Sequence, residues 1–255
     1  MPPQRSPRAR AIARTAALAA VAIGASLGAA GCFGSDNAAT TTDATTTAAT
    51  TGAGTTTAPA TRTVRVYLVR DGKLAVEGRE VADTPAVGAA ALKALLGDQV
   101  FDLTIANGVA TVTGLGAVSR ESKAEIVATL TQFPTVRSVE LEGERLTRLD
   151  IEELTPQILL ESPLPGARIA SPVRLTGTAN TFEATFQIQV LDADGETLST
   201  KFTTATSGNG TRGTFDTEIG FDTAGEQEGT LYLYEQSAED GSPLHEVRVP
   251  VTLLP

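Results

Sequence analysis

Residues 100–115 read VFDLTIANGVATVTGL, and this stretch decides the fold of the first folded part of the chain. Two β-prone runs, Val100–Ala106 and Val109–Leu115, flank the dipeptide Asn107-Gly108. Asn-Gly between such runs is the strongest short-range signal for a β-hairpin, because both turn positions require a positive φ. The stretch therefore predicts a hairpin at the centre of the first domain.

A helix is predicted before this hairpin. Thr84 is suited to the N-cap, Pro85 to the first helical position, and Gly97 to the position just past the end. A β-rich run, Thr63–Val69, precedes the helix and leads into the turn dipeptide Asp71-Gly72. The apolar residues at helical spacing, expected to form the buried face, are Val87, Ala91, Leu92, Leu95 and Leu96.

A second helix is predicted after the hairpin. It begins behind Ser119 as N-cap and runs to about Gln132, and Pro134 blocks its continuation. Val136–Leu141 then forms a strand. The order strand–helix–hairpin–helix–strand is that of an α+β domain, which we assign to residues 62–150. The expected buried residues of this helix are Ala124, Val127 and Leu130.

This segment resembles the sporulation and spore germination domain called GerMN over about residues 63–147. In that family a loop rich in proline and glycine follows the first helix, whereas Gly97-Asp98-Gln99 is very short here. The resemblance implies contacts with other envelope proteins. The residues that carry it are Val66–Leu68, Ala90–Gly97, Asn107–Val112, Ile126–Pro134 and Val136–Val139, with Leu130–Pro134 the most specific block.

The pattern changes to purely β after the first domain. Short β-rich runs separated by turn signals predict an all-β sandwich over residues 155–255. The chain contains no Trp and a single Cys, so this sandwich lacks the Cys–Trp–Cys core of antibody domains. The predicted strands are Gln157–Glu161, Val173–Ala179, Thr185–Leu191, Thr197–Thr206, Gly213–Phe221, Thr230–Gln236 and Glu246–Leu254.

The sandwich resembles the immunoglobulin-like domain of bacterial spore germination over about residues 157–254. That domain often follows a GerMN domain, so the two resemblances support one another. The residues that carry it are Ser162-Pro163, Ser171-Pro172, Gly177–Ala184, Gly213–Phe215, Tyr234–Pro243 and Val249–Val251.

The N-terminus has the features of a secretory signal peptide. Residues 1–31 contain four Arg and no acidic residue, and an Ala-rich apolar stretch follows the basic start. The run ends at Ala29-Ala30-Gly31-Cys32, which resembles the lipobox of bacterial lipoproteins, although the leucine usual three positions before the cysteine is Ala29. The resemblance implies that Cys32 is lipidated with fatty acyl chains such as palmitate. The alternative is an ordinary signal peptide, with Cys32 as a bystander.

Lipidation of Cys32 places the protein on the extracytoplasmic face of the cell membrane. Residues 32–61 form a Thr/Ala-rich linker whose composition predicts disorder. The formal net charge of −10 becomes −14 once the four Arg of residues 1–31 are removed. An acidic body lacks the positive footprint that phosphate backbones select, so nucleic acid is not an expected partner.

Candidate catalytic chemistry is sparse. His245 is the only histidine, and no G-x-S-x-G elbow accompanies it, so we interpret it as a surface residue at a strand edge. A zinc site is not expected, because Cys32 is committed to lipid and one imidazole remains. The sequence therefore predicts no enzyme, no catalytic residue, no cofactor and no metal.

Three acidic groups and one pair of tyrosines are the other candidates. Asp192–Glu196 offers carboxylates for calcium, but a β-turn with solvated acids is the preferred interpretation. Leu141–Glu144 and Glu152-Glu153 are interpreted as solvated strand ends. Tyr232 and Tyr234 share one face of their strand and would form a contact surface if that face is outward.

These observations predict a non-enzymatic interaction or scaffold lipoprotein of the cell envelope. The two resemblances imply a link to sporulation, germination or envelope signalling. The alternative is a module that binds a cell-wall polymer, which exposed aromatic residues on one sandwich face would favour.

Overall fold

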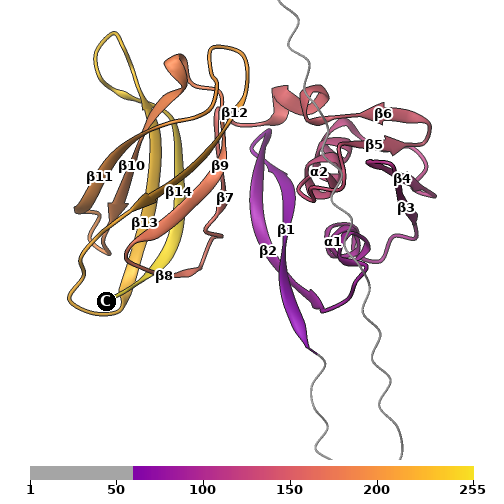
Figure 1. Ribbon diagram of the computed structural model, residues 1–255, viewed down its shortest axis with the longest axis horizontal. Coiled ribbons are helices and arrows are strands. Elements are labelled where there is room, and N and C mark those ends of the chain that lie inside the picture. Colours follow the sequence, from indigo (N-terminus) through magenta and orange to yellow (C-terminus); the bar gives the residue numbers. More distant parts are fainter. Residues whose placement is uncertain (1–59) are drawn as a thin grey trace, which may run out of the picture. The chain divides into compact units, whose positions relative to one another are not determined.

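The computed structural model describes residues 60–255, in which two lobes follow one another along the chain (Figure 1). We call residues 61–154 the N-terminal lobe and residues 155–254 the sandwich lobe. Each lobe has its own cluster of buried apolar side chains, and Leu159 of the sandwich lobe packs into the cluster of the N-terminal lobe. The signal peptide, Cys32 and nearly all of the linker lie outside the described residues.

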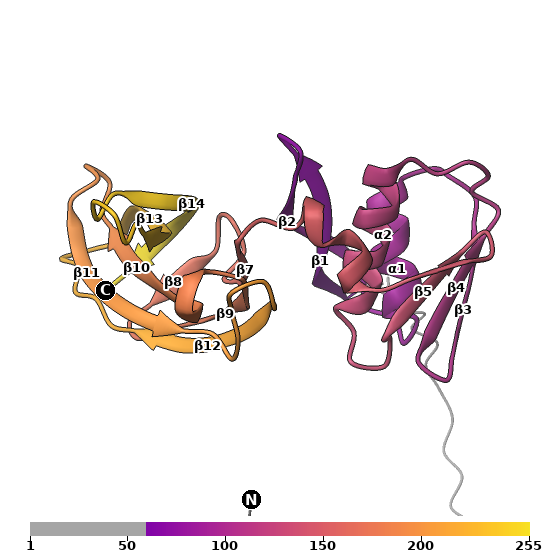
Figure 2. The same cartoon turned by 90° about the horizontal axis from the view of Figure 1, so that it is seen from above.

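The N-terminal lobe has two layers of strands with helices between them (Figure 2). The hairpin β1–β2 lies on one side of the helices and the sheet β3-β4-β5-β6 on the other. Its core combines Tyr67 from the hairpin, Leu92 and Leu130 from the helices, and Val112 and Val139 from the sheet. The elements are β1 Thr61–Arg70, β2 Lys73–Ala82, α1 Val87–Leu96, β3 Asp102–Ala106, β4 Val109–Thr113, α2 Arg120–Thr131, β5 Ser138–Leu141, β6 Glu144–Leu146 and the 3-10 helix η1 Arg148–Leu154.

The predictions of the turn at Asn107-Gly108 and of the cap at Ser119 are confirmed, whereas the prediction for the start of α1 is not. The hairpin closes at Asn107-Gly108, with Asn107 at φ 53° and Gly108 at φ 84°. Ser119 caps α2 as predicted, since its side chain accepts a hydrogen bond from the Ser122 amide. The predicted start of α1 was wrong: Thr84 instead accepts a hydrogen bond from the Ala86 amide, and the helix begins at Val87.

The predicted order of elements omitted two strands of this lobe. β2 pairs with β1 along its whole length, from Arg70↔Lys73 to Thr61↔Ala82. β6 pairs with β5 and closes the sheet next to η1. The order is therefore hairpin–helix–hairpin–helix–hairpin. The predicted boundary between the domains, residues 150–155, falls at the end of η1.

The sandwich lobe consists of two packed sheets. The first sheet has the order β12-β9-β7 and the second the order β11-β10-β13-β14-β8. Leu175, Phe186, Phe215 and Leu231 are buried between them. The strands are β7 Ile158–Ser162, β8 Arg168–Ala170, β9 Val173–Ala179, β10 Thr185–Leu191, β11 Thr197–Thr204, β12 Gly213–Ile219, β13 Gln227–Gln236 and β14 Pro243–Leu254, with a 3-10 turn, η2, at Phe182–Ala184.

The seven predicted strands of this lobe are all present. The strand that the sequence did not reveal is β8, three residues long, which pairs in parallel with the end of β14. The peptide bonds Ser162-Pro163 and Ser171-Pro172 are cis. The described part of the chain is thus β-rich, with α-helices confined to the N-terminal lobe.

Candidate functional site

The site begins at the open edge of β1, which side chains of α2 cover. The Tyr67 amide donates to Thr129 Oγ1 at 3.1 Å and the Val69 amide donates to Glu125 Oε1 at 2.8 Å. Gln132 Nε2 donates to the Arg65 carbonyl at 2.8 Å. Glu125, Thr129 and Gln132 stand at helical spacing on one face, so one polar stripe of α2 replaces a missing neighbouring strand.

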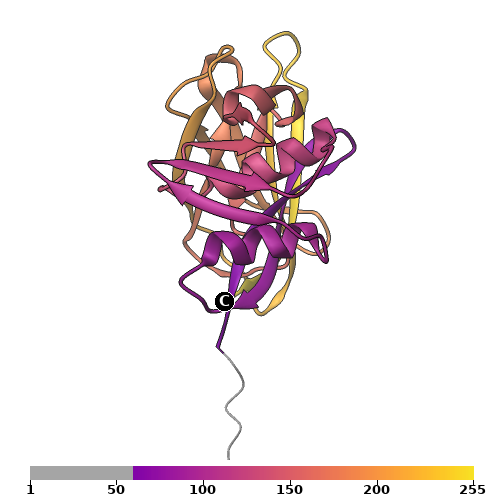
Figure 3. The same ribbon diagram turned by 90° about the vertical axis from the view of Figure 1, so that its right-hand side faces the viewer.

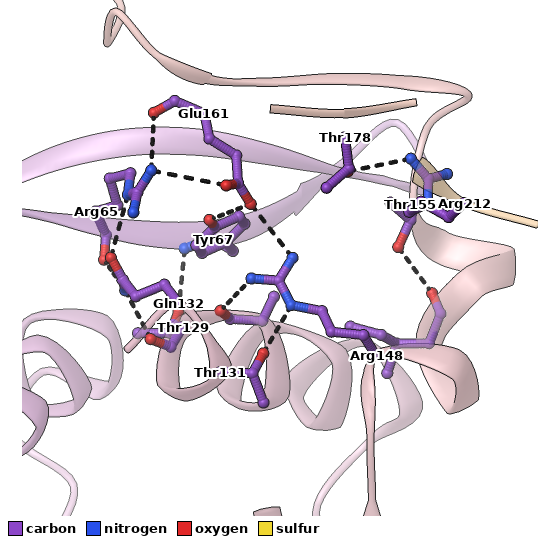
Figure 4. A network of polar contacts seen from close by, with 12 residues as sticks. Arg65, Tyr67, Thr129, Thr131, Gln132, Arg148, Thr155, Glu161, Thr178 and Arg212 are labelled. Atoms are coloured by element: carbon purple, nitrogen blue, oxygen red, sulfur yellow. Dashed lines mark hydrogen bonds and ion pairs between the residues drawn. The ribbon is translucent and has the colours of Figure 1, made fainter. Parts of the chain in front are cut away.

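Tyr67 links the N-terminal lobe to the sandwich lobe. Its ring is fully buried in the core of the N-terminal lobe. Its hydroxyl donates to Glu161 Oε1 at 2.7 Å, and Glu161 lies on β7 of the sandwich lobe (Figure 4). Burial, and secondarily the negative charge of Glu161, raises the pKa of the Tyr67 hydroxyl well above its ordinary value of 10.0.

Two arginines of the N-terminal lobe converge on the same carboxylate (Figure 4). Arg148 Nη1 lies 3.4 Å from Glu161 Oε1, and Arg65 Nη1 lies 3.7 Å from Glu161 Oε2. Arg148 also donates from Nε to Thr131 Oγ1 at 2.7 Å and stands 5.0 Å above the centroid of the Tyr67 ring. The Glu161 carboxylate therefore accepts hydrogen bonds from Tyr67 and Arg148 and forms an ion pair with Arg65, while Arg65 Nη1 donates to the Glu161 main-chain carbonyl at 3.4 Å. We call these residues the Glu161 cluster: Arg65, Tyr67, Arg148 and Glu161.

A second ion pair joins the lobes at the end of η1. Arg212, whose side chain is 12% exposed, donates from Nε to both carboxylate oxygens of Glu152, at 3.1 and 2.9 Å. Its Nη2 donates to the Pro156 carbonyl at 2.7 Å. Asn180 Nδ2 donates to the same carboxylate at 3.1 Å. The interpretation of Glu152 as a solvated strand end was wrong, because its partners come from far along the chain.

A cavity of about 350 Å³ lies between these two clusters. Its walls include Arg148 and Glu152 of the N-terminal lobe and Glu161, Thr178 and Arg212 of the sandwich lobe. Each of its two carboxylates is matched by a guanidinium, so the walls carry little net charge. The described residues that line it include no His or Cys. Chemically, the arrangement suits a fixed joint between the lobes better than a proton-transfer site.

The buried Tyr67 hydroxyl gives the protein a predicted weakness at alkaline pH. Because its pKa is raised in the folded state, the unfolded chain loses this proton first as the pH passes 10.0. The free energy of unfolding should therefore be fully retained below that pH and fall as the pH rises above it. Urea unfolding from about pH 9 to 11.5 should show a shallower fall for Tyr67→Phe than for wild type. Equal slopes would contradict this assignment.

A second surface of interest is the outer face of the larger sheet of the sandwich lobe. Tyr232 and Tyr234 point outward, since Leu231 and Leu233 enter the core. The two rings stack with centroids 4.8 Å apart, and Arg248 covers Tyr232 at 3.8 Å from its ring centroid. Burial raises the pKa of Tyr232 to about 12, helped by its hydrogen bond to Glu246.

Amide side chains connect this tyrosine stack to an exposed phenylalanine. Tyr234 donates to Gln187 Oε1 at 2.7 Å, and Gln187 lies opposite Phe202 in the β10–β11 register. Phe202 is 60% exposed. We call Gln187, Phe202, Tyr232, Tyr234 and Arg248 the tyrosine face. Gln187 and Tyr232 are each only 7% exposed, so the groups that this face offers to solvent are chiefly Phe202, Tyr234 and Arg248.

The remaining candidates from the sequence have structural partners. His245 is half-exposed on β14 with Nε2 3.7 Å from the buried Glu235, and it adopts a positive φ of 55° at a bulge in the pairing of β13 and β14. In the turn at Asp192–Glu196, Asp192 Oδ1 accepts hydrogen bonds from the amides of Asp194 and Glu196 at 3.0 and 2.8 Å. The Asp192 carboxylate therefore stabilises the turn by accepting hydrogen bonds from its backbone amides.

The described residues offer neither a metal cluster nor a membrane-spanning helix. Across residues 60–255, no three His, Cys, Asp or Glu side chains gather closely enough to hold a metal ion. No helix in this range combines the length and apolar character needed to cross a bilayer. Cys32, the predicted lipidation site, lies outside the range, so its role stays a prediction.

Comparisons with known proteins identify the second lobe. Residues 157–242 match the family described as the immunoglobulin-like domain of bacterial spore germination. The match runs from the start of the sandwich to the residue before β14, and it confirms the resemblance predicted for this segment. The sandwich lobe is thus similar to that family over these residues.

The remaining comparisons concern the whole chain. No curated protein matches the sequence. Among solved structures, one similar chain is that of the tandem GerMN domains of the sporulation protein GerM from Bacillus subtilis, with 15% sequence identity and a TM-score of 0.27. The likeness covers 76% of this chain and 61% of that chain, so it spans less than two thirds of the GerM structure.

Proposed function

We propose that this chain is a non-enzymatic lipoprotein of the cell envelope that acts as an interaction or scaffold protein, with a GerMN-type N-terminal lobe. The observation that carries the proposal is the match of residues 157–242 to a spore germination family. A role in sporulation, germination or envelope signalling follows from that association. Cys32 anchors the protein on the extracytoplasmic face of the membrane.

The joint between the lobes supports a binding role. A protein that recognises a partner through two lobes needs them held in a defined relation, because loose lobes lose entropy when they bind. Here Glu161 and Glu152 each pair with arginines across the junction, and Tyr67 adds a hydrogen bond of 2.7 Å. The charged groups of the cavity are thus used to fix the lobes.

The anchor is tested by Cys32→Ala. We expect the variant to move from the membrane pellet to the soluble exported fraction, because the remaining acidic body has no other strong attraction to lipid. Ser35→Ala, a change of similar size three residues away, should stay with the membrane. Fractionation and immunoblotting at high salt measure both variants. If Cys32→Ala still pellets, the chain is not held by this cysteine.

The interaction role is tested by complementation of a deletion strain at matched expression. His245→Ala should retain full function, because no proton transfer depends on that side chain. Removing residues 62–150 should abolish function while the sandwich lobe stays folded, as judged by circular dichroism. Loss of function in His245→Ala, with export and folding unchanged, would overturn the non-enzymatic role.

Binding of a cell-wall polymer is a second candidate, and the tyrosine face favours it. Aromatic rings can stack on the apolar face of a sugar, while amide and guanidinium groups satisfy its hydroxyls. Co-sedimentation with purified cell walls should show a loss of roughly five-fold or more in affinity for Phe202→Ala, about 1 kcal/mol. The control is Phe182→Ala, a residue equally exposed at 60% but on η2. Equal binding by both variants would exclude the tyrosine face.

A further inference from the structure

The strand β3 has an open edge. It pairs with β4 alone, in the register Leu103↔Val112 and Ile105↔Ala110. A two-residue turn makes Ala106↔Val109 a hydrogen-bonded pair, so alternation directs the amides and carbonyls of Leu103 and Ile105 away from β4. Within residues 60–255 no backbone or side-chain group outside the sheet bonds to them. Figure 3 views this sheet with the purple helix α1 beside that edge.

Apolar surface surrounds the open edge. Val100 is 85% exposed and Ile105 is 41% exposed. Behind the edge, a groove of about 300 Å³ lies between Leu103, Ile105, the start of α1 at Gly88, and Phe133. Such an edge invites pairing with another strand unless a charge, a proline or a bulge blocks it. β3 has no proline and no register shift, and its one charged residue is Asp102 at the first position, so the rest of the edge carries no charge.

Three other edge strands of the described chain, β1, β6 and β11, are protected. The polar stripe of α2 covers the edge of β1. β6 is three residues long and carries Glu144 and Arg145. On the edge strand β11, Lys201 crosses to donate to the Glu218 carbonyl at 2.6 Å. The lack of such protection on β3 therefore indicates a surface that is covered by a partner.

The charges at the two ends of β3 indicate what covers it. Asp102 begins the strand and is exposed. At the other end, Arg137 lies against Gly108 and donates from Nη2 to the Asn107 carbonyl at 3.0 Å. Among residues 60–255 neither Asp102 nor Arg137 has an ion-pair partner. One end of β3 thus carries an exposed acid, and the turn at its other end carries an arginine that reaches over from the start of β5.

We infer that β3 pairs antiparallel with β3 of a second copy of this chain, about a two-fold axis that passes through Thr104. In this register Leu103 faces Ile105 of the second copy, and the groups that are free in one chain bond to those of the other. Asp102 of each copy lies beside the hairpin end that bears Arg137. Two-fold symmetry repeats both contacts, so the surface is self-complementary in charge and in hydrogen bonding.

Disulfide cross-linking in the full chain tests this pairing. On the axis, Thr104 would face its own copy as a non-hydrogen-bonded pair, with Cα atoms about 4.5 Å apart, inside the range for a disulfide. Under mild oxidation in intact cells, Thr104→Cys should give at least about five-fold more covalent dimer than Thr111→Cys. Thr111 is the matched control because it lies opposite Thr104 on β4. The unmodified chain supplies the background from Cys32.

Charge reversal sharpens the test. In the Thr104→Cys chain, Asp102→Arg or Arg137→Asp alone should reduce the dimer, since each places like charges together. Co-expression of the two variants with separate tags should restore a mixed dimer, because each copy then supplies the charge that the other needs. Cross-linking no greater than that of Thr111→Cys would overturn the inference. So would a product containing only a different protein, or a yield unaffected by both reversals.

Discussion

Replacing Gly177 with alanine is expected to lower the free energy of unfolding of the sandwich lobe by about 3 kcal/mol. Gly177 lies in the middle of β9, paired with Leu160 on β7 and with Phe215 on β12. An added Cβ would meet the Leu159 carbonyl oxygen and would stand 2.7 Å from Cζ of Phe215. The strand is held on both sides, so it cannot move away from the clash. Urea unfolding of the full chain measures the loss.

The matched control for this prediction is Gly225→Ala. No heavy atom lies within 4 Å of a Cβ built at Gly225, and its φ is not positive. The control should therefore change the free energy of unfolding by less than about 0.5 kcal/mol. A similar loss in both variants would mean that the close approach at Gly177 is not what restricts the position.

Replacing Glu161 with alanine is expected to lower the free energy of unfolding by about 2–3 kcal/mol, because it removes a carboxylate that accepts from two side chains and pairs with a third. Arg65 and Arg148 lose their counter-charge, and the buried Tyr67 hydroxyl loses its hydrogen bond of 2.7 Å. Glu161→Gln should cost less, since an amide oxygen can still accept from Tyr67. The loss is expected to loosen the junction, which hydrogen exchange of β1 and β7 would report.

Glu226→Ala is the control for Glu161. Glu226 also pairs with an arginine, Arg168, but both side chains are more than half exposed. Exposed pairs add little to stability, because water and salt screen them. Urea unfolding should therefore separate the two variants clearly. If Glu226→Ala lowers the free energy of unfolding as much as Glu161→Ala does, burial of the Glu161 cluster does not increase its contribution to stability.

The elements that could be predicted from the sequence are those governed by local chemistry. Asn107-Gly108 required a two-residue turn, and Ser119 supplied a cap for α2, so both were located correctly. β-rich runs separated by turn signals located seven strands of the sandwich. The resemblance to the immunoglobulin-like domain of bacterial spore germination was also predicted from the sequence, and the family match over residues 157–242 confirms it.

β2 could not be predicted because its sequence, KLAVEGREVA, is charged and contains a glycine. Its residues have weak strand preference by themselves, and pairing with β1 over ten residues stabilises the strand. The same reason hid β8, whose three residues pair only with the end of β14. In both cases the partner strand, which lies elsewhere in the chain, supplies the hydrogen bonds.

The sequence by itself determined the hairpin at Asn107-Gly108, the Ser119 cap of α2, the sandwich class and the scarcity of catalytic residue types. Only the tertiary structure decided which polar residues act together. Tyr67 and Glu161 are 94 positions apart, and Arg212 and Glu152 are 60 apart. Sequence periodicity cannot predict such pairs, because the two residues become neighbours only when the chain folds. Glu152, which the sequence indicated to be a solvated acid at a strand end, therefore pairs with Arg212 and helps to join the two lobes.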